Sequence, residues 1–317
     1  MSHRSRGFAL LSAVWLLVAL SALTLELSVV ARQRRLAVAN TLESVRAEAA
    51  AASGVEQQRA RLARLLVRED AGSSWNDPLS VVDPWRNADA SPRDSVVVDN
   101  DAYCVTAVAD LGTLVNINIV DEPGLTRFLI ASSVDPLAAD AVSQSIMDWR
   151  DADDFRRLRG AERDEYIKAD ARELPRNGPF ESVDELRFVR GVTRAMLETL
   201  TPRLTVFGTG EVNVNKAPEP VLLSVPGMTP LAAAIITGAQ RDRRRIASLR
   251  QLMDMLPSPA RAAFEQQAAS VARLTFDTHE LQVRSVGWVK GSPIRVRQAA
   301  LVTRVGSTPV VMWRSRE

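Results

Sequence analysis

Apolar residues are spread unevenly along the chain, and the densest run lies near its beginning. Residues 8–25 carry no charge, and neither Gly nor Pro interrupts residues 8–53. At about 1.5 Å per residue the uncharged run is roughly 27 Å long, close to the thickness of a bilayer's hydrocarbon core. The pattern predicts one helix over 8–70, with 8–31 crossing a membrane. Arginines stand on both sides of the run, so the charge pattern leaves its orientation open.

Beyond this run the apolar positions narrow to one stripe at spacings of three and four. Such a stripe is typical of one face of an exposed helix. It allows two interpretations: the stripe covers the chain's own globular domain, or it packs against the rods of other subunits, and both can hold on successive turns. The stripe consists of Val38, Leu42, Val45, Ala49 and Ala52.

The pattern changes twice more along the chain. Residues 95–98 and 103–118 are rich in β-branched positions and predict strands, and residues 123–270 predict mainly helices. The C-terminal part returns to strand patterns at 279–289, 294–304 and 309–314, joined by short turns. Strands on both sides of a helical block predict an α+β fold in which an antiparallel sheet domain is interrupted by a large all-α insertion.

An internal repeat and two helix-turn-helix outlines lie in the predicted insertion. Val-Asn-x-Asn occurs at 115–118 and again at 212–215, each time followed by a Pro and a short apolar helix. We interpret the four Asn side chains as structural, bonding the backbone of the next turn. The segments 182–200 and 218–241 resemble helix-hairpin-helix units, a module that binds phosphates in DNA-repair proteins. Under that alternative, the DNA-binding face is Arg241, Arg243, Arg244 and Arg245.

Charge and rare residues limit the chemistry. The formal net charge is only +2, which is too balanced for a chain that coats nucleic acid. Cys104 is the single cysteine and excludes a disulfide within the chain, and the two histidines, His3 and His279, offer little for a catalytic triad or a multi-His metal centre. We therefore expect no enzyme.

An acidic cluster is the strongest candidate for a bound ion. Four carboxylates fall within residues 148–154, and Glu162 and Glu165 follow after a Gly-Ala step. Arginines lie nearby, so one interpretation is a surface loop in which the carboxylates form ion pairs with them. The other is a calcium site, because calcium binds closely spaced oxygens on an irregular loop. The spacing is not that of an EF-hand, and a catalytic pair is a weaker third interpretation. The acidic residues of this cluster are Asp148, Asp151, Asp153, Asp154, Glu162 and Glu165.

The N-terminus resembles the class III signal of type IV pilins and type II secretion pseudopilins: a basic leader, Gly7, and then Phe8 opening an apolar helix. The resemblance implies cleavage after Gly7 by a prepilin peptidase and N-methylation of Phe8. Most members carry Glu at the fifth mature residue, where this chain has Ser12. Among pseudopilins that absence is typical of the large minor pseudopilin, the protein K family, which the acidic pattern and the inserted layout also resemble.

The resemblance also implies an organisation and partners. It implies a leader (1–7), the helix (8–70), a pilin-like domain formed by 71–118 plus 276–317, and an inserted helical domain (119–275). It implies an anchor in the bacterial inner membrane with the globular part in the periplasm. It also implies that Asp148, Asp151, Asp153 and Glu162 have a role in binding calcium, with Asp154 and Glu165 as further candidate ligands. The partners would be minor pseudopilins of the I, J and H types at the pseudopilus tip, meeting Ser12, Val38, Leu42 and Val45.

Three alternatives stay open from the sequence. A cleaved secretory signal peptide would explain the apolar run, although the run is longer than usual. A membrane-anchored nucleic-acid-binding protein would use the helix-hairpin-helix turns, and its affinity would fall steeply with salt. An enzyme with a signal anchor is the weakest of the three, because no nucleophile, base and oxyanion set can be assembled.

Overall fold

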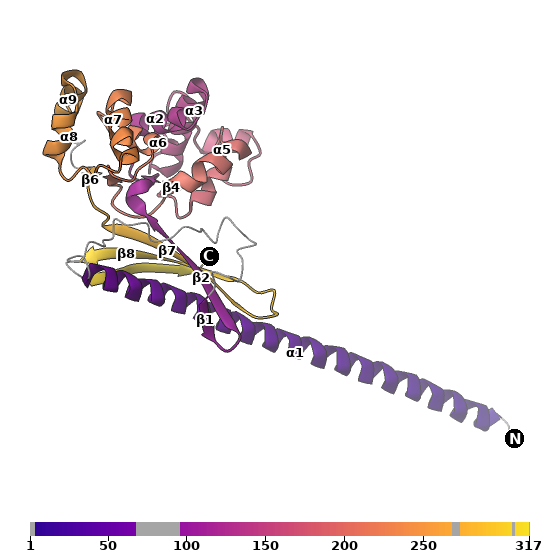
Figure 1. The fold of residues 1–317 in the computed structure, drawn as a ribbon. Coiled ribbons are helices and arrows are strands. Elements are labelled where there is room, and N and C mark those ends of the chain that lie inside the picture. The colour runs from indigo at the N-terminus through magenta and orange to yellow at the C-terminus, as the bar shows by residue number, and fades with distance from the viewer. Residues whose placement is uncertain (1–3, 68–95, 268–272, 306–307, 317) are drawn as a thin grey trace.

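A computed structural model describes residues 4–67, 96–267, 273–305 and 308–316, and within the first helix the side chains of residues 13–64. The described chain has three parts: a long helix, a five-stranded sheet lying on its C-terminal half, and a helical unit on the other side of the sheet (Figure 1). The predicted loop residues between 71 and 95, and the turn at Gly306 and Ser307, lie outside the described residues.

Helix α1 runs without interruption from Arg4 to Val67, about 96 Å at 1.5 Å per residue. Its N-terminal part projects far beyond the globular part of the molecule (Figure 1). Gly54, the first glycine after Gly7, does not end the helix, which passes through this residue. Gly54 is buried, and a Cβ there would come within 2.4 Å of the Ser285 hydroxyl. The glycine therefore allows close approach to the sheet rather than a break.

The contact between α1 and the sheet is built from small residues. Ala47, Ala50 and Ala51 are almost fully buried. Opposite them lies Gly287, where a Cβ would stand 2.1 Å from the carbonyl oxygen of Ala47 and 2.4 Å from the amide nitrogen of Ala51. Without a side chain at this position, the helix backbone can lie directly on the strand. Further along, Val55 and Leu62 of α1 join a small core with apolar residues of β7 and β8: Leu281, Val283, Ala300 and Val302.

The sheet has the strand order β1-β2-β7-β8-β9, and every neighbouring pair is antiparallel. The three C-terminal strands form the predicted meander. Strand β2 pairs over its whole length with residues 281–289 of β7, even though the helical unit separates the two strands in sequence. The strands are β1 (Val96–Asp99), β2 (Ala102–Asp110), β7 (Glu280–Val289), β8 (Val296–Val305) and β9 (Thr308–Arg316).

The helical unit is built from short helices around one large apolar core, in which Phe128, Ile146 and Ile236 are among the buried side chains. Most of its helices begin at a side-chain cap, such as Ser182 and Ser248. The α-helices are α2 (Glu122–Ala131), α3 (Pro136–Arg150), α4 (Arg163–Lys168), α5 (Arg194–Leu200), α6 (Glu219–Leu223), α7 (Pro230–Arg241), α8 (Leu249–Met255) and α9 (Ser258–Glu265); the 3₁₀ helices are η3 (Leu111–Thr113), η4 (Val183–Phe188) and η5 (Thr201–Arg203).

Two parallel strand pairs, which the sequence does not predict, organise this unit. Strand β3 (Val115–Asn116) pairs with β4 (Leu204–Thr205), and β5 (Val212–Asn213) pairs with β6 (Leu274–Thr275). The unit thus consists of two copies of one motif, each opening and closing on a parallel pair. The first copy contains α2 to α5, and the second contains α6 to α9.

The repeated Asn residues fasten each copy in the same way. Asn118 receives a hydrogen bond from the Phe180 amide at 2.8 Å and donates to the carbonyls of Phe180 and Val206. Asn215 receives one from the Ile246 amide at 2.8 Å and donates to the carbonyls of Ile246 and Phe276. The structural interpretation of these side chains is correct, and Phe180 and Ile246 mark equivalent positions.

The helical unit is tied to the sheet at the end of β2 and the start of β7. The Asp110 carboxylate accepts hydrogen bonds from Asn213 (3.1 Å) and Thr278. Glu280 of β7 accepts from the Thr209 amide at 2.8 Å, in the link between the two copies. The rings of Phe207 and Trp313 stand 4.3 Å apart and join the same link to β9. These contacts fix the helical unit on the sheet face opposite α1 (Figure 1).

Candidate metal centre and membrane helix

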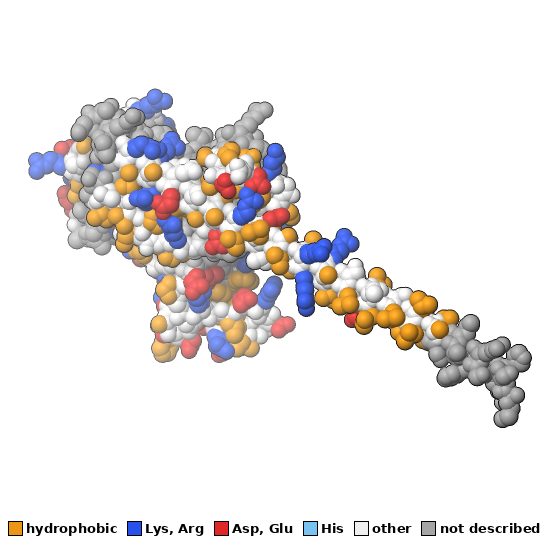
Figure 2. Space-filling model, turned by 90° about the horizontal axis from the view of Figure 1, so that it is seen from below, with side chains coloured by type: hydrophobic (Ala, Val, Ile, Leu, Met, Phe, Trp, Pro, Cys, Tyr) orange, Lys and Arg blue, Asp and Glu red, His pale blue; other side chains and the backbone are white. Residues whose placement is uncertain are grey.

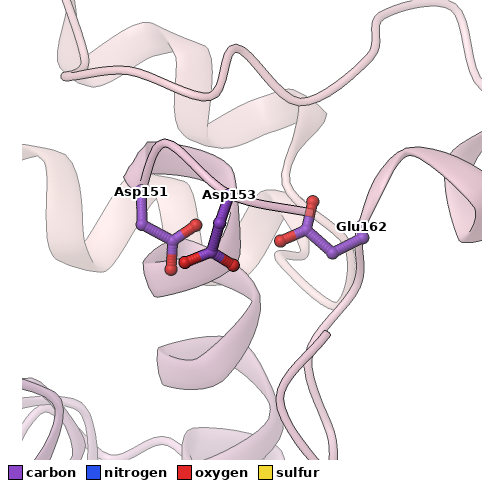
Figure 3. A group of neighbouring side chains, drawn as sticks. All are labelled: Asp151, Asp153 and Glu162. Carbon is purple, nitrogen blue, oxygen red and sulfur yellow. The ribbon is translucent and has the colours of Figure 1, made fainter. Parts of the chain in front are cut away.

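The acidic cluster forms an irregular loop between α3 and α4, in the first copy of the repeat. One carboxylate oxygen each from Asp151, Asp153 and Glu162 lies within 4.8 Å of the other two. Figure 3 shows that the two aspartates follow the end of α3, while Glu162 approaches from the segment that leads into α4. Three oxygens that converge from two segments can hold a hard cation such as calcium.

Glu162 gives the clearest sign that this group is a site rather than a solvated surface. Glu162 is only 4% exposed, and neither of its carboxylate oxygens has a hydrogen-bond partner. Burial raises its pKa to about 7, and the negative charges of Asp148 and Asp151 add to that effect. One oxygen of Asp151 is also buried without a partner. Orphaned acceptors of this kind are costly unless a cation or a proton satisfies them.

Asp148 lies beneath the loop and is fully buried. Burial raises the pKa of its carboxyl, although hydrogen bonds from Arg157 oppose that shift. The Arg157 guanidinium lies 2.7 Å from Asp148 and 2.5 Å from Asp151, and it also reaches Glu122 of α2 at 3.2 Å. Arg157 therefore neutralises part of the cluster and leaves Asp153 and Glu162 as the carboxylates most open to a metal.

The two remaining candidates have other partners in the structure. Asp154 accepts a hydrogen bond from the Asn177 side chain at 2.9 Å. Glu165 accepts one from the Glu162 amide at 3.1 Å and caps the start of α4. Burial tends to raise the pKa of Glu165, but these backbone hydrogen bonds outweigh it and the pKa is lowered. The structure thus gathers three of the six predicted residues, and the assignment of ligands stays a prediction.

Two residues that shape this loop are not candidates in the sequence analysis. At Gly160 a Cβ would come within 2.0 Å of the Asp148 carboxylate, so only glycine leaves room for it. Arg157 acts through the fold, because its contacts to Asp148 and Glu122 depend on how α2 and α3 pack. The Gly-Ala-Glu sequence at 160–162 could have indicated Gly160. No local pattern distinguishes Arg157 from the other arginines of the loop.

The apolar stripe of α1 faces away from the chain's own sheet. Val38, Leu42 and Val45 are 70%, 61% and 57% exposed. At 100° per residue, the stripe lies roughly 180° around the helix from buried Ala47 and Ala51. The interpretation that the stripe covers the chain's own domain is therefore wrong, and a different helix face does so. The stripe is free for contact with another protein.

The rod itself has the character of a membrane segment. By length and composition, the helix could cross a bilayer, and its side chains are exposed from Ala13 to Leu42. Figure 2 shows apolar side chains gathered along the rod, with a cationic group between them and the globular part. The arginines that follow the apolar run in the sequence are Arg32, Arg34 and Arg35. Gly7, Phe8 and Ser12 belong to α1, but their side chains lie outside the described residues.

The helix-hairpin-helix turns form as predicted. Gly191 and Gly227 have φ of 85° and 73°, the left-handed conformation that favours glycine, and Thr193 and Thr229 cap the helices that follow. Arg245, from the group offered as a DNA-binding face, forms an ion pair with Asp277. The turns serve the two copies of the repeat as tight connections between packed helices.

Comparison with known proteins gives consistent results. Residues 111–209 match the family model "Type II secretion system (T2SS), protein K". The chain is 25% identical to the type II secretion system protein K of Klebsiella pneumoniae over 99% of this chain and 97% of the relative. It is 30% identical to that of Dickeya chrysanthemi over 35% of this chain and 29% of the relative.

The fold also matches a solved structure, that of the GspK-GspI-GspJ complex from enterotoxigenic Escherichia coli. The TM-score is 0.65 at 17% identity, covering 88% of this chain and 99% of the matched chain.

Together, the long apolar helix, the antiparallel sheet on its C-terminal half and the inserted helices give the fold of the matched chain, with a first helix long and apolar enough to cross a membrane. Over nearly its whole length the chain is similar to type II secretion system protein K, and the matches support a minor pseudopilin of that system. None of the matched descriptions names a catalytic activity, and none supports the nucleic-acid-binding alternative.

Proposed function

We propose that this subunit sits at the tip of the type II secretion pseudopilus, where it assembles with other minor pseudopilins and starts or caps the fibre during export across the outer membrane. The observation that carries the proposal is the geometry of α1. One face of its C-terminal half lies on the sheet, while the opposite face, with Val38, Leu42 and Val45, and the described part of the projecting helix from Ala13 on remain exposed. The apolar side chains of such a helix need a membrane around them before assembly and neighbouring helices around them after assembly.

The partners follow from the same helix. The matched complex is described as one of GspK with GspI and GspJ. For this chain we propose subunits of the I and J types, with the H type next along the fibre, packing on Val38, Leu42 and Val45. The helical unit on the far side of the sheet would obstruct a further subunit above it, and Ser12 in place of the usual Glu fits a subunit with no neighbour above to pair with.

Processing and placement are part of the proposal. A prepilin peptidase would cut between Gly7 and Phe8, after which Phe8 would be N-methylated. The anchor would cross the inner membrane once, with the globular part in the periplasm. The intact mass of the chain, expressed with and without the peptidase, tests this route. A product beginning at N-methylated Phe8 is expected, whereas an uncut chain or one cut near residue 30 would contradict it.

The tip contact has a sharper test. Val38→Cys or Leu42→Cys should give disulfide cross-links to matched cysteines in I-type or J-type subunits. Asn40→Cys, exposed on the opposite side of the helix, is the matched control and should give none. Equal cross-linking from both faces would remove the support for this interface.

We also propose calcium as the cation of the acidic loop, held by Asp151, Asp153 and Glu162. The three converging oxygens and the unpartnered, buried carboxylate of Glu162 support a hard cation there. Bound calcium would supply charge neutralisation that fixes the loop. Calorimetric titration should show binding to the wild type and a large loss with Asp153→Asn; equal binding by both would contradict the assignment.

A further inference from the structure

The two copies of the repeat in the helical unit carry opposite charge. The first copy, residues 115–205, has 17 acidic and 13 basic residues, whereas the second, residues 212–275, has 4 acidic and 8 basic residues. The whole chain carries a formal charge of only +2. One motif used twice therefore presents surfaces of opposite sign, and such surfaces attract different partners.

The positive charge of the second copy is concentrated in one short stretch, here called the arginine patch. It consists of Arg241, the last residue of α7, and of Arg243, Arg244 and Arg245 directly after it, all of them exposed. Among the described residues, only Arg245 has a carboxylate partner, which is Asp277. Three guanidinium groups are thus available to another molecule.

The first copy shows that the fold does not require arginines at this place. There, residues 151–179 connect α3 to Phe180; in the second copy, residues 242–245 make the corresponding connection from α7 to Ile246. A helix C-terminus favours a nearby cation, but the connection after α3 begins with the aspartates of the acidic cluster and the helices of that copy still pack. The arginine patch is therefore additional to what the packing needs.

The backbone at Arg243 supports the same conclusion. This residue has a φ of 54°, in the left-handed region, and it follows the C-cap residue of α7, where glycine is the usual choice. The turn itself is closed by backbone groups, because the Arg244 amide donates to the Ala239 carbonyl at 2.9 Å. An arginine in this conformation costs stability that a glycine would not cost. Its side chain therefore serves something other than the turn.

The chemistry of the patch selects an anionic partner, and its surroundings favour a protein over a lipid surface. Guanidinium groups pair with carboxylates or phosphates through two parallel hydrogen bonds. Surfaces that bind lipid usually combine cations with apolar side chains that insert. Among the large hydrophobic residues described as exposed, none lies between residues 232 and 304. Helices α7 and α8 also lie on the side of the sheet opposite α1, far from the projecting rod (Figure 1).

The position of the patch on α7 argues against a nucleic-acid backbone as the partner. A helix-hairpin-helix binds phosphates at its turn, which here contains Gly227 and precedes α7. The arginine patch lies at the other end of this helix of 12 residues, roughly 18 Å away. The turn and the patch therefore do not form one phosphate site. A compact group of carboxylates on a protein is the partner that the charges select.

We propose that the arginine patch is a docking site for a protein that presents a cluster of carboxylates. The acidic first copy would repel the same partner, so that the partner would bind at one end of the helical unit only. The proposal rests on the proposed function in one respect, namely that a subunit of the pseudopilus would meet this partner.

The first test measures binding without a pseudopilus. The purified full chain in a non-ionic detergent should bind a fluorescent oligoglutamate peptide, with an affinity that falls as salt rises. Arg243→Gln with Arg244→Gln should weaken this binding about fivefold, the size expected for the loss of two exposed ion pairs. Arg172→Gln with Arg190→Gln is the matched control, because it removes the same charge from exposed positions of the first copy, and it should leave the affinity unchanged.

A glycine variant separates the patch from the fold. Glycine fits the left-handed backbone at position 243, so Arg243→Gly should raise the midpoint of thermal unfolding while it weakens peptide binding. Because the variant would be more stable than the wild type, misfolding would not explain its loss of binding. Unchanged peptide binding in Arg243→Gly and in the double glutamine variant would overturn the proposal.

The second test measures export in a secreting strain. Arg243→Gln with Arg244→Gln should reduce export while its incorporation into pseudopili stays unchanged, and the control variant should leave both unchanged. Unchanged export with the patch variant, or an equal loss with the control, would overturn the proposal. So would displacement of the peptide by short-chain phosphatidylglycerol at a lower concentration than by unlabelled oligoglutamate, which would assign the patch to a lipid surface. Failure of the wild-type chain to enter pseudopili would count against the proposed function alone, since peptide binding is measured on the purified chain.

Discussion

Replacing Glu162 by glutamine should stabilise the chain without calcium and weaken it with calcium. The residue is 4% exposed, and burial together with nearby carboxylates raises its pKa from 4.5 to about 7. At about 1.4 kcal/mol per pKa unit, that difference corresponds to about 3 kcal/mol against the ionised form in the folded chain. Glutamine has nearly the same shape and no charge, so Glu162→Gln removes this penalty.

The pH dependence fixes the sign of the effect. Because the folded pKa is raised, the contribution of Glu162 to stability is fully present below its unfolded pKa and is lost as the pH rises through about 7. Without calcium, Glu162→Gln should therefore gain up to about 3 kcal/mol over the wild type at pH 8. At pH 4.5, where the wild-type carboxyl is largely protonated, the two chains should differ little.

Calcium should reverse the order. A ligand at one hundred times its Kd stabilises the folded state by about 2.7 kcal/mol, and the variant should lose most of that gain. Urea unfolding at pH 8 measures the free energy of unfolding of the wild type and of Glu162→Gln, each with chelator and with calcium. Glu165→Gln is the control, because the lowered pKa of Glu165 predicts a small loss of stability instead. A variant at Glu162 that is less stable than the wild type in chelator at pH 8 would refute the reasoning.

Two further predictions concern the scaffold. Gly287→Ala should cost about 3 kcal/mol in urea unfolding, because its Cβ would lie 2.1 Å from the Ala47 carbonyl oxygen, whereas Gly238→Ala, with no atom within 4 Å, should be neutral or stabilising; equal effects would contradict the close-approach argument. Asn118→Ala and Asn215→Ala each remove three hydrogen bonds and should each lower the free energy of unfolding by about 3 kcal/mol, and a difference above about 2 kcal/mol between them would argue against equivalent roles in the two copies.

Local patterns predict most of the architecture. The uninterrupted run that starts at Phe8 predicts α1, and the C-terminal alternation predicts the meander of β7, β8 and β9. The role of Gly54 could not be predicted, because a glycine in a helix acts as a breaker or as a contact point depending on what lies opposite. Here Ser285, far away in sequence, decides it. The face of α1 that meets the sheet was missed for the same reason, since alanines such as Ala47 carry little hydrophobic signal.

The acidic site shows a similar limit. The clustering of carboxylates near Asp151 is visible in the sequence, and so is the return of a carboxylate at Glu162. Which of them meet depends on the path of the loop, which is set by Gly160 beneath it and by Arg157 reaching across to Glu122. Long-range ion pairs of this kind have no local signature. The sequence therefore indicates which acidic residues are candidates for a cation site. It does not reveal which of them could be ligands and which, like Glu165, cap a helix.

The pairing of β2 with β7 has a consequence for how the molecule can be altered. Asp110, the last residue of β2, lies opposite Leu281, the second residue of β7, so the chain leaves and re-enters the sheet at one point. A tight turn of two residues normally closes such an antiparallel pair. The whole helical unit therefore occupies the place of a hairpin turn. We therefore expect that the helical unit can be enlarged, exchanged or excised without changing the register of any strand. The long helix and the sheet would keep their arrangement while the helical unit varies.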